Sequence, residues 1–230
     1  MALRSLTVCL WLCLALAFPA SAQEAARELR LPPVDEAARD ASWVNFKNRL
    51  LNALATRDRK FVLSILDRNV RSGLDEQRGI EQFRQQWGLD DDDSPLWRQL
   101  PTALFLGGAF MKFDKRPTEF CAPYVSVKWP DDIDAVGGGA IVAKEALAKS
   151  APSSDSETVA TLSYDIVEVS DWEVADRSPD AKQKWVKIRL KGSEAYVPEE
   201  QIRSPVEHTA CFIKAAGGWR LIGFAPGGGN

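Results

Sequence analysis

Histidine is almost absent from this 230-residue sequence, which holds a single copy at His208. A hydrolytic triad requires a nucleophile, a base and an orienting group, and a zinc site requires three or four closely spaced ligands. One histidine supplies neither, and strand alternation would place Cys211 on the opposite face from it. The aspartates at residues 90–93 lack the glycine and glutamate of a calcium loop and are expected to be solvated. The sequence therefore favours a protein that is not an enzyme, and predicts no metal and no cofactor.

Positive charge is not in excess either. Lys and Arg number 29 against 32 Asp and Glu, which gives a formal net charge of −3. The sequence thus lacks the basic field that attracts nucleic-acid phosphates. No dense basic tract indicates a membrane surface. Neither nucleic acid nor a lipid surface is an expected partner.

No hydrophobic run is long enough to favour a membrane anchor. The most apolar segment, residues 6–18, follows Arg4 and precedes small residues at positions 20–22. This order is typical of a secretory signal peptide, here residues 1–22, that is cleaved before Gln23. We expect a periplasmic or secreted protein without a transmembrane anchor.

Cysteine is scarce, because two of the four copies lie in the expected signal peptide and only Cys121 and Cys211 remain. An oxidising compartment favours a disulfide between them. Loop-closure estimates give such a bridge roughly 3–5 kcal/mol of stabilisation. The alternative is two buried free thiols, because cysteine also packs as a small hydrophobe.

The clearest strand pattern lies in residues 146–205, where short β-type runs are each followed by a turn. Residues 185–190 alternate apolar and polar side chains at a period of two, as in a half-buried strand. Residues 195–198 return after a turn. Residues 171–184 are expected to form a long, charged hairpin loop.

Several short motifs follow one another through this segment. They are Lys149-Ser150-Ala151-Pro152-Ser153, Ala160-Thr161-Leu162, Val167-Glu168-Val169, Trp185-Val186-Lys187-Ile188, Tyr196-Val197 and Ile202-Arg203. In this order they resemble the bacterial SH3-like (SH3b) family, although Lys149 stands where that family has Arg, and Ala151 and Ala195 where it commonly has Gly. The resemblance covers a quarter of the chain and implies a small β-barrel that binds a ligand.

Aromatic side chains are the candidate ligand contacts of this segment. Trp172 lies in the expected charged loop, and with Tyr164, Trp185 and Tyr196 it is predicted to form a groove for an extended peptide or glycan. The alternative is that Trp185 and Tyr196 pack inside the barrel. Peptidoglycan or an envelope protein is the expected partner, and the sequence does not indicate the oligomeric state.

The flanking segments predict helices and a closing hairpin. Apolar residues recur at helical spacing in residues 40–56, which Ser42 would cap. The other expected elements are shorter helices at 60–66, 78–87 and 95–106, strands at 69–72, 109–113 and 120–130, and a hairpin at 209–224 that turns at 216–218.

The helices and the closing motif Gly217-Gly218-Trp219-Arg220-Leu221 resemble the NTF2-like (cystatin-like) fold. The expected fold class is therefore α+β, with NTF2-like helices on a curved antiparallel sheet plus an SH3-like β-barrel. An appended barrel is the alternative to an inserted one. The expected organisation is a signal peptide at 1–22, an extended arm at 23–40, the first part of the NTF2-like domain at 41–139 with a glycine linker at 137–139, the barrel at 140–205, and the closing hairpin of the first domain at 206–230.

The expected function is that of an exported, non-enzymatic binding protein of the cell envelope. Its SH3-like module would recognise a peptide, a wall fragment or a protein partner. An alternative is a small-molecule isomerase or hydrolase that uses the conical pocket of the NTF2-like fold, with Asp67, Asp75 or Tyr124 as candidate groups. A third possibility is a scaffold that dimerises through an apolar strip.

Overall fold

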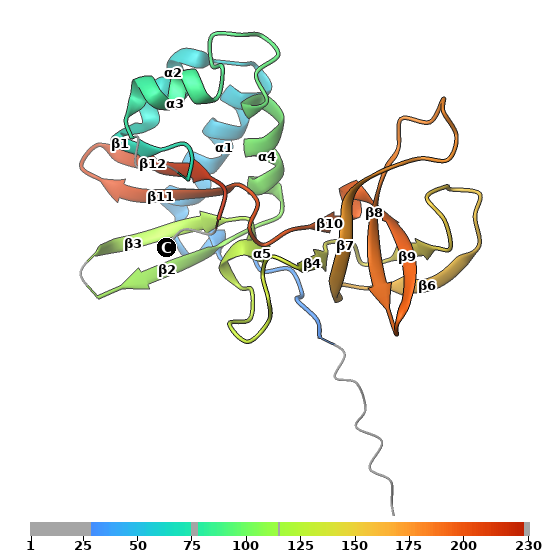
Figure 1. The fold of residues 1–230 in the computed structure, drawn as a ribbon. Helices are drawn as coiled ribbons and strands as arrows, with labels where there is room; N and C mark the ends of the chain where they lie inside the picture. Colours follow the sequence, from blue (N-terminus) through green and yellow to red (C-terminus); the bar gives the residue numbers. More distant parts are fainter. Residues whose placement is uncertain (1–28, 75–77, 115, 228–230) are drawn as a thin grey trace, which may run out of the picture.

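The chain has an α+β fold that contains two β-sheets (Figure 1). The computed structural model describes residues 29–74, 78–114 and 116–227. One sheet has five strands in the order β1-β12-β11-β3-β2, and the other has seven in the order β10-β4-β7-β8-β9-β5-β6. The seven strands of the second sheet all come from the stretch of chain between β3 and β11. The expected signal peptide, residues 1–22, lies outside the described residues.

Helices cover one face of the five-stranded sheet (Figure 1). They are α1 (Ala41–Ala55), α2 (Arg59–Ile65), α3 (Ile80–Gln86) and α4 (Leu96–Phe105). The predicted cap of α1 was wrong by two residues. The Asp40 carboxylate accepts the backbone N–H of Ser42 at 2.7 Å and that of Trp43 at 3.3 Å, so Asp40 is the N-cap and Ser42 lies inside the first turn.

The five-stranded sheet joins segments from both ends of the chain. Its strands are β1 (Leu66–Arg71), β2 (Ala109–Phe113), β3 (Arg116–Ala122), β11 (Thr209–Ala215) and β12 (Gly218–Ala225). The pairing of β11 with β12 confirms the predicted closing hairpin. β1 runs parallel to β12, and the other pairs are antiparallel.

Aromatic side chains fill the space between the helices and this sheet. Trp43 of α1 is fully buried, and its ring centroid lies 4.2 Å from that of Phe120 and 4.9 Å from those of Phe212 and Trp219. Such large rings contribute most of the apolar area that a small core can remove from water. This packing explains why apolar residues recur at helical spacing along α1.

The seven-stranded sheet has an apolar inner face that includes Val186, Ile188, Val197 and Ile202. Its strands are β4 (Gly138–Ile141), β5 (Ala146–Lys149), β6 (Thr158–Leu162), β7 (Ile166–Ala175), β8 (Lys184–Leu190), β9 (Ser193–Pro198) and β10 (Ile202–Arg203). A 3₁₀ turn, η2 (Glu199–Gln201), connects β9 to β10. All of the pairings in this sheet are antiparallel.

Two segments predicted as a strand and a linker differ in the structure. The strand expected at 120–130 ends at Ala122, because Pro123 has no N–H for the ladder, and α5 (Tyr124–Val127) follows. The glycines expected as a flexible linker belong in part to buried β4. A Cβ on Gly138 would lie 2.5 Å from a ring carbon of Trp129, so close packing requires glycine there.

The sequence suggested that Trp172 lies in a charged loop, but the structure places it in a strand. Strand β7 continues through it to Ala175, and the connection to β8 begins at Asp176. The Trp172 side chain is half-buried and packs against the apolar inner face. The register of β7 against β8 shifts twice between Val169 and Val174, which breaks the period of two that identifies a strand.

A third apolar cluster joins the two sheets. It contains Tyr124 and Val125 of α5, Ala140 of β4, and Leu31 of the N-terminal segment. The Leu31 N–H donates to the Tyr164 carbonyl at 2.8 Å, so the N-terminal segment pairs with the start of β7. Within the described residues, no helix has the length and hydropathy to cross a bilayer.

Candidate functional site

The predicted disulfide is present between Cys121 of β3 and Cys211 of β11. The two residues face each other across the ladder, with an S–S distance of 2.09 Å and a Cα–Cα distance of 4.2 Å. Both are 3% exposed. The bridge confirms the disulfide alternative over two free thiols and links residues that are 90 positions apart.

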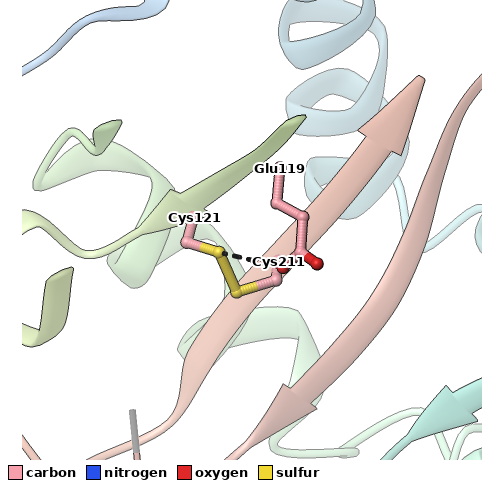
Figure 2. Close-up of side chains that lie close together, drawn as sticks. All are labelled: Glu119, Cys121 and Cys211. Carbon is pink, nitrogen blue, oxygen red and sulfur yellow. Dashed lines mark hydrogen bonds between the residues drawn. A yellow bond between two sulfur atoms is a disulfide. The ribbon is translucent and has the colours of Figure 1, made fainter. Parts of the chain in front are cut away.

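The Glu119 carboxylate lies beside this disulfide, as Figure 2 shows. Its Oε2 is 4.0 Å from the Cys121 sulfur, and the ligand atoms of Glu119, Cys121 and Cys211 all lie within 4.8 Å of one another. Metal binding would require thiolates, and sulfurs bonded to each other supply none. In the disulfide state this buried group offers no thiolate to a metal ion.

Two of the four predicted aromatic contacts share the outer face of the seven-stranded sheet. Val186 and Ile188 point to the apolar inner face, so Trp185 between β7 and β9 points outward. Tyr196 shares this outer face because it is paired with Lys187, two residues from Trp185. The Trp185 indole N–H donates to Asp176 Oδ2 at 2.7 Å, and the ring is only 2% exposed because the β7–β8 loop covers it.

The other two predicted contacts lie elsewhere. Trp172 borders a separate cavity of about 320 Å³ together with Ile202 and Glu207. Tyr164 lies in the turn between β6 and β7, where its φ is 59° and its carbonyl holds the N-terminal segment. No ring contact joins any two of the four aromatic residues in the described part of the chain. They do not form the single groove that the sequence suggested.

A groove on the outer face adjoins Trp185, and we name it the Trp185 groove. It has a volume of about 500 Å³, and its apolar side chains are Leu147 of β5, Trp185 of β8 and Pro198 of β9. Leu147 is 43% exposed although it is a large aliphatic residue. Leu147 and Pro198 were not predicted from the sequence. The signal for Leu147 is the alternation of β5, because its neighbours Ala146 and Ala148 face inward and Leu147 therefore faces outward.

Two of the charged side chains around this groove already make hydrogen bonds within the described part of the protein, and a third does not. Lys149 Nζ donates to the Ser156 carbonyl and to Thr158 Oγ1, each at 3.1 Å. Asp176 accepts the Trp185 indole N–H. Glu145 lines the groove, is exposed, and has no hydrogen bond or ion pair from its side chain among residues 29–74, 78–114 and 116–227. Glu145 and Asp176 outnumber the single ammonium group of Lys149, so the groove has a net negative charge.

His208 is surrounded by aromatic side chains. Its ring lies 4.9 Å from that of Trp87 and 5.4 Å from that of Phe224, between the helices and the five-stranded sheet. Burial, followed by the charge of Arg203, lowers the pKa of His208 from 6.5. Burial raises the pKa of Glu207, although Arg203 lies 2.7 Å from its carboxylate and opposes the shift. The sulfur of Cys211 is held in the disulfide, so a Cys–His pair is not available.

Two of the three residues suggested for an enzymatic pocket, Asp67 and Tyr124, lie in the described part of the chain, on different elements. Asp67 accepts the backbone N–H of Asn69 at 2.8 Å within β1. Tyr124 lies in the cluster between the sheets, where burial, followed by the proximity of Tyr164, raises the pKa of its hydroxyl to about 12. Asp75 lies outside the described residues. Comparison with protein-family profiles, characterised proteins and solved structures found no match.

Proposed function

We propose that this protein is an exported, non-enzymatic binding protein that holds an extended peptide of an envelope partner in the Trp185 groove. The observation that carries the proposal is the outward exposure of large apolar side chains on adjacent strands. Leu147 of β5 is 43% exposed, and Val159 of its neighbour β6 is 50% exposed. Burial of such side chains against a partner is the main source of binding free energy at peptide grooves.

The chemistry of the groove favours an apolar peptide that carries a basic residue. Leu147 and Pro198 provide apolar contact beside the covered Trp185 ring. The groove has two carboxylates, Glu145 and Asp176, against the single ammonium group of Lys149. Glu145 is the carboxylate left to pair with a Lys or Arg of the ligand. An ion pair at such a rim contributes more to specificity and on-rate than to affinity.

The finer fold assignments belong to this proposal. The consecutive hairpins β5–β6, β7–β8 and β8–β9 support an SH3-like module, and four helices on one face of a five-stranded sheet support an NTF2-like unit. The disulfide supports export, because such bridges persist in oxidising compartments. The signal-peptide pattern of residues 1–22 supports the same location.

Peptide binding can be tested by fluorescence anisotropy with labelled ten-residue peptides that combine Leu and Pro with no, one or two Arg residues. We expect the Arg-containing peptides to bind best. Leu147→Glu is expected to weaken binding by about threefold to ninefold, because a ligand can bury only the exposed 43% of the residue, worth about 0.6–1.3 kcal/mol. Glu145→Lys is expected to remove the preference for Arg.

The matched control is Leu74→Glu, which makes the same change at a side chain that is 81% exposed and outside the groove. It should bind as the unchanged protein does. Binding of no peptide in the set, or equal losses in Leu147→Glu and Leu74→Glu, would refute a site at the Trp185 groove.

A further inference from the structure

A second, chemically different cleft lies between α4 and the seven-stranded sheet, and we name it the α4 cleft. In Figure 1, α4 lies at the side of the helical layer that is nearest to β10 and β8. The cleft has a volume of about 740 Å³, within the range of ligand-binding sites. All of its lining residues are polar or charged, which distinguishes it from the Trp185 groove.

The local charge of the α4 cleft opposes that of the whole chain. Four basic residues, Arg98, Lys182, Lys184 and Arg203, line it against two glutamates, whereas the chain has a formal net charge of −3. Arg98, Lys182 and Lys184 make no ion pair within the part of the chain that the structure describes. The basic side chains are contributed by two walls, Arg98 by α4 and the lysines by the β7–β8 connection and the start of β8. The cleft therefore favours a ligand with separated negative charges.

Two buried polar atoms of the lining lack partners. Gln99 Oε1 and Arg203 Nε are both buried and make no hydrogen bond to other described residues. Arg203 pairs with Glu207 through Nη2 at 2.7 Å, so its Nε remains as a donor. Leaving a buried polar atom without a partner is unfavourable, and a ligand that satisfies the atom recovers that cost.

One of these two atoms is a hydrogen-bond acceptor and the other is a donor, which limits the class of ligand that can satisfy both. Gln99 Oε1 accepts a hydrogen bond and Arg203 Nε donates one. A peptide group supplies both an N–H and a carbonyl, whereas a fully ionised phosphate supplies only acceptors. Glu200, which accepts from Gln183 at 2.7 Å, would also repel a dense anionic charge on this side of the cleft.

We propose that the α4 cleft binds an acidic peptide segment. Carboxylates of the ligand pair with Arg98 on one wall and with Lys182 and Lys184 on the other, and its backbone hydrogen-bonds to Gln99 and Arg203 after these two side chains turn toward the cleft. This site does not depend on the function proposed for the Trp185 groove, because the residues that hold the ligand are different.

The test is fluorescence anisotropy of a rhodamine-labelled eight-residue peptide of alternating Glu and Gly. We expect saturable binding that weakens with salt, and no binding of the analogue with Gln in place of Glu. Arg98→Glu and Lys184→Glu should each weaken binding at least tenfold. Lys60→Glu, the same charge change on the exposed surface of α2, should alter it less than twofold.

Two further measurements separate recognition of a peptide at this cleft from attraction of any anion and from binding at the Trp185 groove. Gln99→Leu removes the acceptor while it keeps the size of the side chain, and it should weaken peptide binding. Leu147→Glu should leave binding of the acidic peptide unchanged. The proposal is overturned if the peptide does not bind, if Lys60→Glu weakens binding as much as Arg98→Glu does, or if inorganic phosphate displaces the peptide and binds with the same dependence on Arg98.

Discussion

Reduction of the Cys121–Cys211 disulfide is expected to lower the free energy of unfolding by several kcal/mol. The bridge joins residues 90 positions apart and constrains the unfolded chain. For a loop of this length the chain-entropy relation gives about 4.6 kcal/mol at 25 °C. This value applies if both sheets unfold in one transition.

A smaller effect is expected if the seven-stranded sheet stays folded while the five-stranded sheet unfolds. β4 and β10 are paired, with Ala140 opposite Arg203, so the folded sheet already holds the two ends of the intervening segment together. The effective loop then shrinks to about 28 residues, and the same relation gives about 3.6 kcal/mol. The size of the effect thus reports whether the two sheets unfold together.

Urea unfolding, monitored by tryptophan fluorescence and circular dichroism with and without reductant, measures this difference. For a protein of this size, a loss of about 3.6–4.6 kcal/mol corresponds to a fall in melting temperature of about 7–18 °C. A Cys121→Ala/Cys211→Ala variant is the control, and its stability should not respond to reductant. Oxidised and reduced proteins whose unfolding free energies agree within about 1 kcal/mol would contradict the reasoning.

Two further predictions concern stability. Gly138→Ala should destabilise the fold by about 1–3 kcal/mol in urea unfolding, because its Cβ would lie 2.5 Å from the Trp129 ring, whereas Gly223→Ala, with no atom nearer than 3.6 Å, should not. The pKa of His208 is lower in the folded protein than its ordinary value of 6.5, so the unfolded chain binds the proton more readily. This residue therefore makes the free energy of unfolding fall as the pH drops through 6.5 and below. His208→Phe should flatten that fall in melting temperature, and an unchanged profile would contradict it. Glu207, whose pKa is raised, acts with the opposite sign.

The sequence predicted those elements whose periodicity results from packing against a core. The apolar spacing of α1 and the closing hairpin of β11 and β12 are two such elements. Their side chains Trp43, Phe212 and Trp219 meet in one cluster, and this packing requires the apolar pattern that the sequence shows. Compartment and cysteine count left the disulfide as one of two alternatives, and the structure decides between them. The cross-strand register of the disulfide, and the position of Glu119 beside it, depend on strand pairing between distant segments, which no local pattern shows.

The failures have specific physical causes. The strand around Trp172 was expected to be a charged loop. Two register shifts in β7 break the alternation that normally reveals a strand in the sequence. Gly138 was assigned to a flexible linker, but the need for glycine comes from the Trp129 ring, nine residues earlier in the chain. The outward direction of Trp185 can be read from the sequence, because residues 185–190 alternate in such a way that it shares a face with Lys187 and Arg189, not with Val186.

The two proposed binding surfaces share one element, and this decides which variants can distinguish them. The β7–β8 loop covers Trp185 through the hydrogen bond from its indole to Asp176, and near its other end Gln183 donates to Glu200 at the α4 cleft. Gln183 lines both surfaces. A substitution in this loop would therefore disturb both sites and identify neither. Leu147 and Arg98 lie on β5 and α4, outside the loop, so a loss of binding in one of these variants but not the other assigns a peptide to one surface.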